Sequence, residues 1–102
     1  TNKALFLNYS LGIDDLTADF SNRPYFKCEL YIDGIASGLF VIVQEINIGA
    51  QMQFNVSGIR NLSAGSHTID ARITRWFNNG AAADFNQDFG TLSSVFDAAY
   101  LN

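Results

Sequence analysis

Hydrophobic side chains recur at every second position along most of this chain. The clearest run alternates ring or aliphatic side chains with polar ones, in the order His67-Thr68-Ile69-Asp70-Ala71-Arg72-Ile73-Thr74. A period of two places alternate side chains on opposite faces of a strand, whereas a helix needs a period near 3.6. Apart from the segment around Ala98-Ala99, no stretch of the chain keeps a helical period over the length of a helix. The pattern therefore predicts an all-β protein, an antiparallel β-sandwich of jelly-roll-like form, with residues 1–102 as one domain.

Turn residues divide this pattern into strands, which we expect over 4–11, 25–32, 39–48, 51–56, 67–76 and 92–101. The polar stretch 14–24 reads as a loop with at most one short helical turn, and 81–85 as either a short strand or part of a loop. Asp33-Gly34 favours a tight hairpin turn because both residues tolerate positive φ; a reversal at Ala36-Ser37-Gly38 is the alternative. Ser63-Ala64-Gly65 is the expected turn before the strand that starts at His67.

The charge balance excludes several classes of function. Hydrophobic residues make up 48% of the chain and charged residues 16%, with a net charge of -4. An acidic, charge-poor domain lacks the basic surface that a nucleic-acid binder needs, and so many apolar residues exclude disorder. The longest apolar run, 39–43, is far shorter than the roughly 20 residues that span a bilayer. We therefore expect no nucleic-acid partner and no membrane insertion. The first residue is Thr1, which suggests a processed product or an excised domain.

The lone cysteine and the lone histidine are both expected to be structural. Cys28 cannot form an intramolecular disulfide or a metal cluster by itself, and its alternating surroundings predict burial as a small hydrophobe. His67 has no second imidazole with which to bind zinc. Since it follows a glycine turn, we expect its nitrogens to bond backbone carbonyls of that turn. No cofactor is expected.

Two segments with a strong turn signal resemble a known group of domains. Glu29-Leu30-Tyr31-Ile32-Asp33-Gly34 is a strand that ends in an aspartate-glycine turn, and Leu62-Ser63-Ala64-Gly65-Ser66-His67-Thr68-Ile69 is a glycine turn that leads into a strand. Together with the closing strand, these two segments resemble jelly-roll domains of tailed-bacteriophage virion proteins, such as tail-fibre or receptor-binding heads and capsid decoration proteins. They are similar, more weakly, to jelly-roll carbohydrate-binding modules.

The resemblance covers residues 25–76 and implies a structural role. It implies a β-sandwich in the virion, often trimeric, that binds copies of itself, other virion proteins, or a host surface or glycan. The segment 94–101 is more alanine-rich than is usual in those families.

Acidic clusters give no convincing catalytic or metal site. Asp84-Phe85-Asn86-Gln87-Asp88 begins like a calcium loop, but glycine stands seventh instead of sixth and Val95 holds the twelfth position, which excludes an EF-hand. A looser calcium site at Asp84–Asp88 is left open. Asp14, Asp15 and Asp19 lie in the expected polar loop, where solvated carboxylates are usual. We therefore expect a protein that is not an enzyme, with a small hydrolase as the remaining alternative.

An aromatic loop is the candidate binding site. Trp76, Phe77, Asn78 and Asn79 follow the strand that starts at His67 and lead into Gly80. A sugar ring could stack on Trp76 while the two amides bond its hydroxyls. The alternative is that Trp76 caps the core or lies in a subunit contact.

Two hypotheses follow. The first is a non-enzymatic virion domain that packs against copies of itself and other virion proteins, because interfaces are rich in aromatic residues and poor in charge. The resemblance implies that a trimer is favoured. The second is a carbohydrate-binding module that uses the Trp76 loop, which a glycan array with Trp76→Ala would test.

Overall fold

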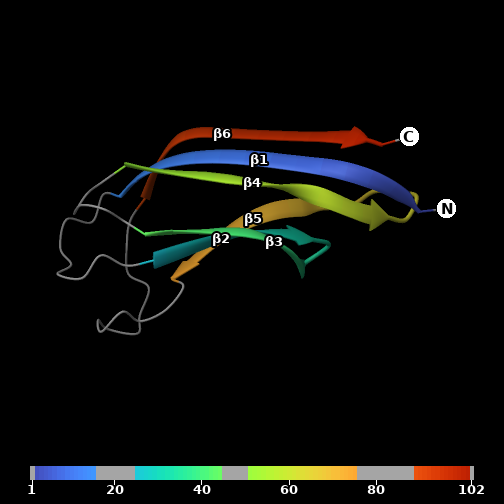
Figure 1. The fold of residues 1–102 in the computed structure, drawn as a ribbon, viewed down its shortest axis with the longest axis horizontal. Helices are drawn as coiled ribbons and strands as arrows, with labels where there is room; N and C mark the ends of the chain where they lie inside the picture. Colours follow the sequence, from blue (N-terminus) through green and yellow to red (C-terminus); the bar gives the residue numbers. More distant parts are fainter. Residues whose placement is uncertain (1, 16–24, 45–50, 76–88, 102) are drawn as a thin grey trace.

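The fold is an antiparallel β-sandwich of two three-stranded sheets, as the alternation predicts (Figure 1). The computed structural model describes residues 2–15, 25–44, 51–75 and 89–101. One sheet has the strand order β4-β1-β6 and the other β3-β2-β5. The strands are β1 (Lys3–Asp15), β2 (Tyr25–Ile32), β3 (Ile35–Gln44), β4 (Gln51–Leu62), β5 (Ile69–Arg75) and β6 (Phe89–Tyr100). Except between β2 and β3, each strand is followed by one in the other sheet, which gives the expected jelly-roll-like alternation.

The hairpin between β2 and β3 turns at Asp33-Gly34. Ile32 pairs with Ile35, and the two residues between them have φ values of 52° and 81°. Positive φ at both central positions is the type I′ geometry, which matches the twist of the flanking strands. The turn prediction is therefore confirmed. The alternative segment, Ala36-Ser37-Gly38, lies within β3, where it forms a bulge: Glu29 pairs with Phe40 and Tyr31 with Ala36.

The core lies between the two sheets and contains the inner side chains of β1, β2 and β4. Paired positions share a face, so the period of two in the sequence becomes a continuous apolar layer. The buried hydrophobic residues are Leu7, Leu11 and Ile13 of β1, Phe26, Cys28 and Leu30 of β2, and Met52, Phe54 and Val56 of β4. Ile69, Ala71 and Ile73 of β5 pack against this core, which confirms the inner face expected for that strand.

Several strand boundaries differ from the sequence predictions. β1 includes Asp14 and Asp15, which were expected in a loop, because their backbone continues the ladders with Gln51 of β4 and with Gly90 and Phe89 of β6. β3 begins at Ile35 instead of position 39, and β4 runs to Leu62 instead of position 56. Positions 45–48, 81–85 and most of 14–24 lie outside the described residues.

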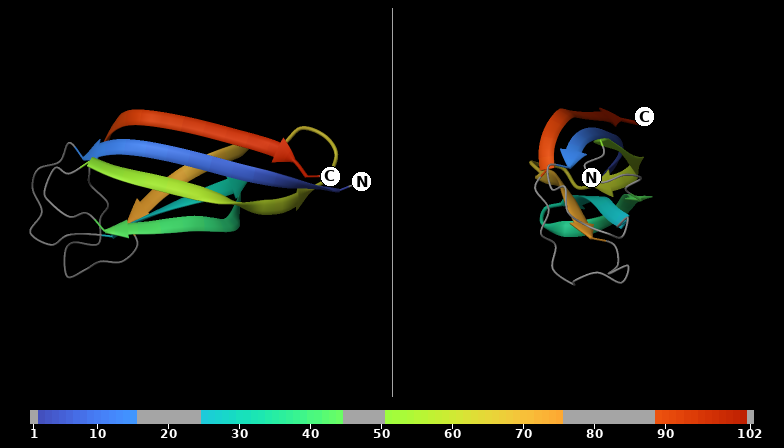
Figure 2. Two further views of the ribbon diagram at one scale, coloured as in Figure 1. Left: turned by 45° about the horizontal axis from the view of Figure 1, so that its top comes forward. Right: turned by 90° about the vertical axis from the view of Figure 1, so that its left-hand side faces the viewer.

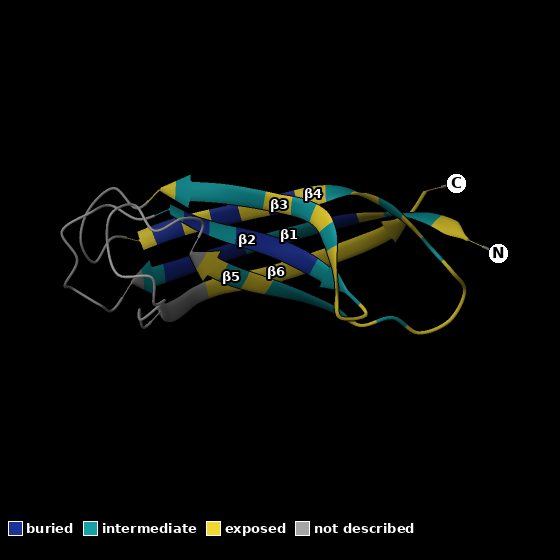
Figure 3. Cartoon of the chain, turned by 90° about the horizontal axis from the view of Figure 1, so that it is seen from below, coloured by how far each residue is buried: buried dark blue, intermediate teal, exposed yellow. Residues whose placement is uncertain are grey.

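Strand β6 is covered much less than its neighbours. Tyr9 pairs with Phe96 and Leu5 with Tyr100, which places both β6 side chains on the inner face of their sheet. Even so, Phe96 is 43% exposed and Tyr100 is 68% exposed. Figure 3 shows β6 exposed along its described length, and Figure 2 (right) shows the two sheets end on. The described part of the other sheet thus leaves the inner face of β6 uncovered.

Candidate functional site

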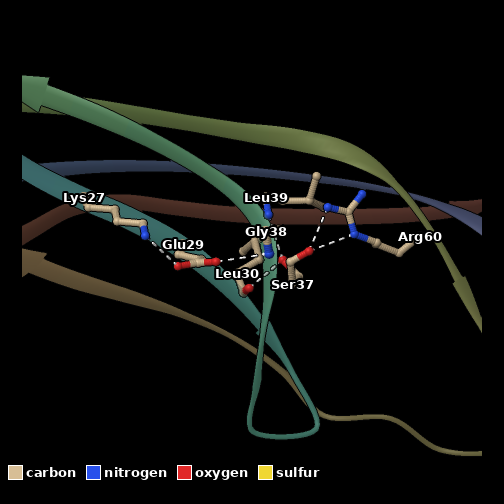
Figure 4. A network of polar contacts seen from close by, with 7 residues as sticks. All are labelled: Lys27, Glu29, Leu30, Ser37, Gly38, Leu39 and Arg60. Carbon is tan, nitrogen blue, oxygen red and sulfur yellow. Dashed lines mark hydrogen bonds and ion pairs between the residues drawn. The ribbon is translucent and has the colours of Figure 1, made fainter.

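The bulge in β3 holds a compact polar cluster that joins both sheets (Figure 4). Glu29, which is 8% exposed, accepts a hydrogen bond through Oε2 from the Gly38 amide at 3.0 Å. Its Oε1 lies 3.1 Å from Lys27 Nζ. Gly38 has a φ of 82°, a conformation that glycine adopts at little cost. A buried carboxylate with these partners stabilises the bulge.

Ser37 and Arg60 complete the cluster. The Ser37 hydroxyl donates to the Leu30 carbonyl at 2.6 Å and accepts from the Leu39 amide at 3.0 Å. Arg60 of β4 donates through Nε and Nη2 to the Ser37 carbonyl, at 2.9 and 2.7 Å. The hydroxyl proton is engaged with a backbone carbonyl, and no histidine is among these contacts. The cluster therefore ties β3 to β4 and does not have the form of a nucleophilic site.

His67 is held from both sides. Its Nδ1 lies 2.7 Å from Asp33 Oδ2, and its Nε2 lies 2.7 Å from the Ser63 carbonyl. Asp33 also accepts from the Thr68 amide through Oδ1 at 2.9 Å. The hydrogen bond that the imidazole donates to the Asp33 carboxylate, followed by the one it donates to the Ser63 carbonyl, raises the pKa of His67 above its usual 6.5. Hydrogen bonds from His67 and Thr68 lower the pKa of Asp33 below 3.8.

This arrangement connects the β2–β3 turn to the segment that leads into β5. The sequence predicted that both ring nitrogens of His67 bond backbone carbonyls of the turn. Nε2 does bond the Ser63 carbonyl, but Nδ1 bonds the Asp33 carboxylate. With both nitrogens engaged, His67 is not placed to act as a general base or a metal ligand.

Strand β6, at the edge of its sheet, exposes apolar side chains on both of its faces. Val95 is 55% exposed and Phe96 is 43% exposed, and Leu101, just after the strand, is 44% exposed. Among the described strands, β6 pairs only with β1, so its other backbone edge has no strand partner. We refer to Val95, Phe96 and Leu101, together with that edge, as the β6 surface.

A pocket of about 410 Å³ lies where the C-terminal end of β6 meets the β4–β5 connection. Leu5, Leu62 and Ile69 supply aliphatic walls, and Lys3, Ser63 and Tyr100 supply polar atoms. Lys3 Nζ lies 5.4 Å from the centroid of the Tyr100 ring. Ala64, Gly65 and His67 complete the lining.

The binding residues chosen from the sequence do not coincide with these features. Trp76, Phe77, Asn78 and Asn79 lie outside the described residues, as do Asp84–Asp88. Cys28 is fully buried, as expected, and burial raises the pKa of its thiol to about 11. Within the described ranges, no group of three His, Cys, Asp or Glu side chains is placed to hold a metal ion. No helix among those residues is long and apolar enough to cross a membrane.

No local pattern in the sequence predicts the pocket. Lys3 and Tyr100 are 97 positions apart, and only the antiparallel pairing of β1 with β6 brings them together. Nor do the residues of β6 indicate that its inner face is exposed, since aromatic residues such as Phe96 and Tyr100 are usual on a covered face.

No protein-family model, curated protein or solved structure matches the chain.

Proposed function

We propose that the chain is a non-enzymatic assembly domain whose β6 surface packs against another copy of itself. The observation that carries the proposal is the exposure of Val95 and Phe96 on opposite faces of an edge strand. A long apolar edge strand is an open template for another strand, and proteins usually protect such edges with lysine, proline, a bulge or a covering segment. β6 is 12 residues long and contains neither lysine nor proline, and its one register shift against β1 lies between Thr91 and Ser93, before Val95 and Phe96.

Charge favours a second copy as the occupant. Each chain carries a net charge of -4, so two copies repel one another over most of their surfaces. Asp97 is the only charged residue of β6. The β6 surface therefore carries little of this negative charge, and depletion of charge at the centre is typical of subunit interfaces. A closed ring or a two-fold pair would each cover the edge.

The resemblance to phage proteins implies three copies and an assembly in a virion beside other virion proteins. Both remain predictions within this proposal, as does binding to a host surface. A glycan site at Trp76 also remains a prediction.

Light scattering tests the assembly with a matched pair of variants. The wild-type chain is expected at a small multiple of its 11.2 kDa mass, three for the favoured trimer. Val95→Lys introduces a charge on β6 and should give the monomer. Ile35→Lys introduces the same charge at a side chain that is 72% exposed in the β2–β3 hairpin, and should leave the mass unchanged. A wild-type monomer at micromolar concentration would contradict the proposal.

A further inference from the structure

The pocket beside Tyr100 is formed by the end of the sandwich and is separate from Val95 and Phe96. Lys3 pairs with Leu62 and Leu5 with Tyr100, so all four residues belong to the inner face of one sheet at the same end. Opposite them lie Ile69 of β5 and the connection that contains Gly65. A volume of about 410 Å³ is in the range of sites for small molecules.

Lys3 provides a cation at this pocket. Its ammonium lies over the Tyr100 ring, at 5.4 Å from the centroid, an arrangement that holds the charge in place while leaving it accessible to water. Among the described residues, Lys3 has no acidic partner. The other nearby ionisable pair, His67 and Asp33, carries opposite charges on bonded atoms when His67 is protonated. In that state the described residues around the pocket carry a net positive charge, although the whole chain is acidic.

The remaining lining combines apolar and hydrogen-bonding groups. Leu5, Leu62 and Ile69 can contact C–H groups, while the Ser63 hydroxyl, the Tyr100 hydroxyl and the 64–65 backbone can bond hydroxyl groups. A ligand that matches all of these is a ring with C–H faces, several hydroxyls and one negative charge.

We propose that this pocket binds an acidic monosaccharide unit, with its carboxylate paired to Lys3 and its ring against Leu5 and Ile69. The inference does not rest on the assembly proposal, because it uses the N-terminal end of β1, the β4–β5 connection and Tyr100, and neither Val95 nor Phe96 lines the pocket. An exposed ion pair contributes little by itself, so the affinity of one sugar unit is expected in the millimolar range.

Titration of the full chain, followed by amide chemical shifts, tests the ligand class. Galacturonate and galactose differ at C6, where a carboxylate replaces a hydroxymethyl group, and acetate supplies the carboxylate without the ring. Galacturonate should shift the amides of residues 63–67, whereas galactose and acetate should bind at least about tenfold more weakly. Equal binding of galactose or acetate, or no shift at these amides with galacturonate, would overturn the proposal.

Two single-charge variants test the assigned residue. Lys3→Gln should weaken galacturonate binding by about tenfold or more. Arg72→Gln removes the same charge from the outer face of the other sheet, where Arg72 is bonded to Asp70 and lies over Tyr31, and should leave binding unchanged. Equal affinity of Lys3→Gln and wild type would overturn the assignment. The same titration of the Val95→Lys variant should give the wild-type affinity, and a loss there would show that the site needs the assembly, contrary to the inference.

Discussion

The imidazole of His67 and the carboxylate of Asp33 form a close ion pair, Nδ1 to Oδ2 at 2.7 Å, between two turns that are 34 positions apart in the sequence. The carboxylate also caps the Thr68 amide, and the Asp33 amide donates to the Thr68 carbonyl at 2.7 Å. These contacts hold the β2–β3 turn against the start of β5, beside the pocket.

Stability is expected to depend on the charge of this pair. The pKa of His67 is raised above 6.5, so its contribution is full below 6.5 and is lost as the pH rises through the raised pKa. The pKa of Asp33 is lowered below 3.8, so its contribution is full above 3.8 and is lost as the pH falls through the lowered pKa. The pair should therefore stabilise the fold most between these two values.

Thermal unfolding between about pH 5.5 and about pH 8 measures the contribution of His67 to stability. The Cys28 thiol ionises above this pH range and does not affect the comparison. Wild type should lose melting temperature across this window, while His67→Gln should show a flatter profile. Identical slopes for the two proteins would contradict the role given to His67.

Loss of the Glu29 carboxylate should destabilise the bulge. Glu29→Ala removes the acceptor of the Gly38 amide and the partner of Lys27 at a largely buried position, for an expected loss of about 1–2 kcal/mol of unfolding free energy. Asp70→Ala is the matched control: it also removes a carboxylate bonded to a cation, but at an exposed pair, so its cost should be below about 0.5 kcal/mol. Urea unfolding of both variants compares them, and equal costs would be inconsistent with a stabilising cluster.

A side chain at position 58 should require the Leu39 side chain to move. A Cβ at position 58 would clash with the Leu39 side chain, which crosses from β3 onto β4. Gly58→Ala should therefore cost about 1–3 kcal/mol of unfolding free energy. In the double variant Gly58→Ala/Leu39→Ala the clash is absent, so the combined cost should be smaller than the sum of the two single costs. Additive costs in urea unfolding would show that this contact is not the reason for glycine.

Cys28 should resist alkylation until the protein unfolds. Its pKa of about 11, against the usual 9.0, lowers the thiolate fraction about a hundredfold at a given pH below 9, and burial blocks access further. Iodoacetamide labelling, followed by mass spectrometry, should be at least about a hundredfold slower in buffer than in denaturant. Comparable rates would mean that β2 is not packed as described.

Hydrophobic alternation and turn residues in the sequence were enough to predict the strand faces and the hairpin turn. The alternation in β2 and β5 assigned their inner faces correctly, and Asp33-Gly34 located the hairpin, because both features depend on residues within a few positions. The start of β3 was placed too late since Ala36-Ser37-Gly38 has turn composition, whereas it is a bulge held by Glu29 and by Arg60 of the other sheet.

The candidate sites could not be predicted in the same way. Whether the inner face of β6 is covered depends on the width of the opposite sheet, which no local pattern reports. Lys3 reaches Tyr100 only through the β1–β6 register. Asp14 and Asp15 are polar residues that belong to a strand because the ladder with β4 extends to Asp14 and the ladder with β6 extends to Asp15.

Amide hydrogen exchange of the β6 segment is the most direct test of the assembly proposal. If a second copy covers the β6 surface, peptides spanning residues 93–101 should exchange slowly at high protein concentration and faster on dilution into the monomer range, while peptides of β2 stay protected throughout. Exchange in β6 that is independent of concentration, in a chain whose β2 remains protected, would contradict the proposal.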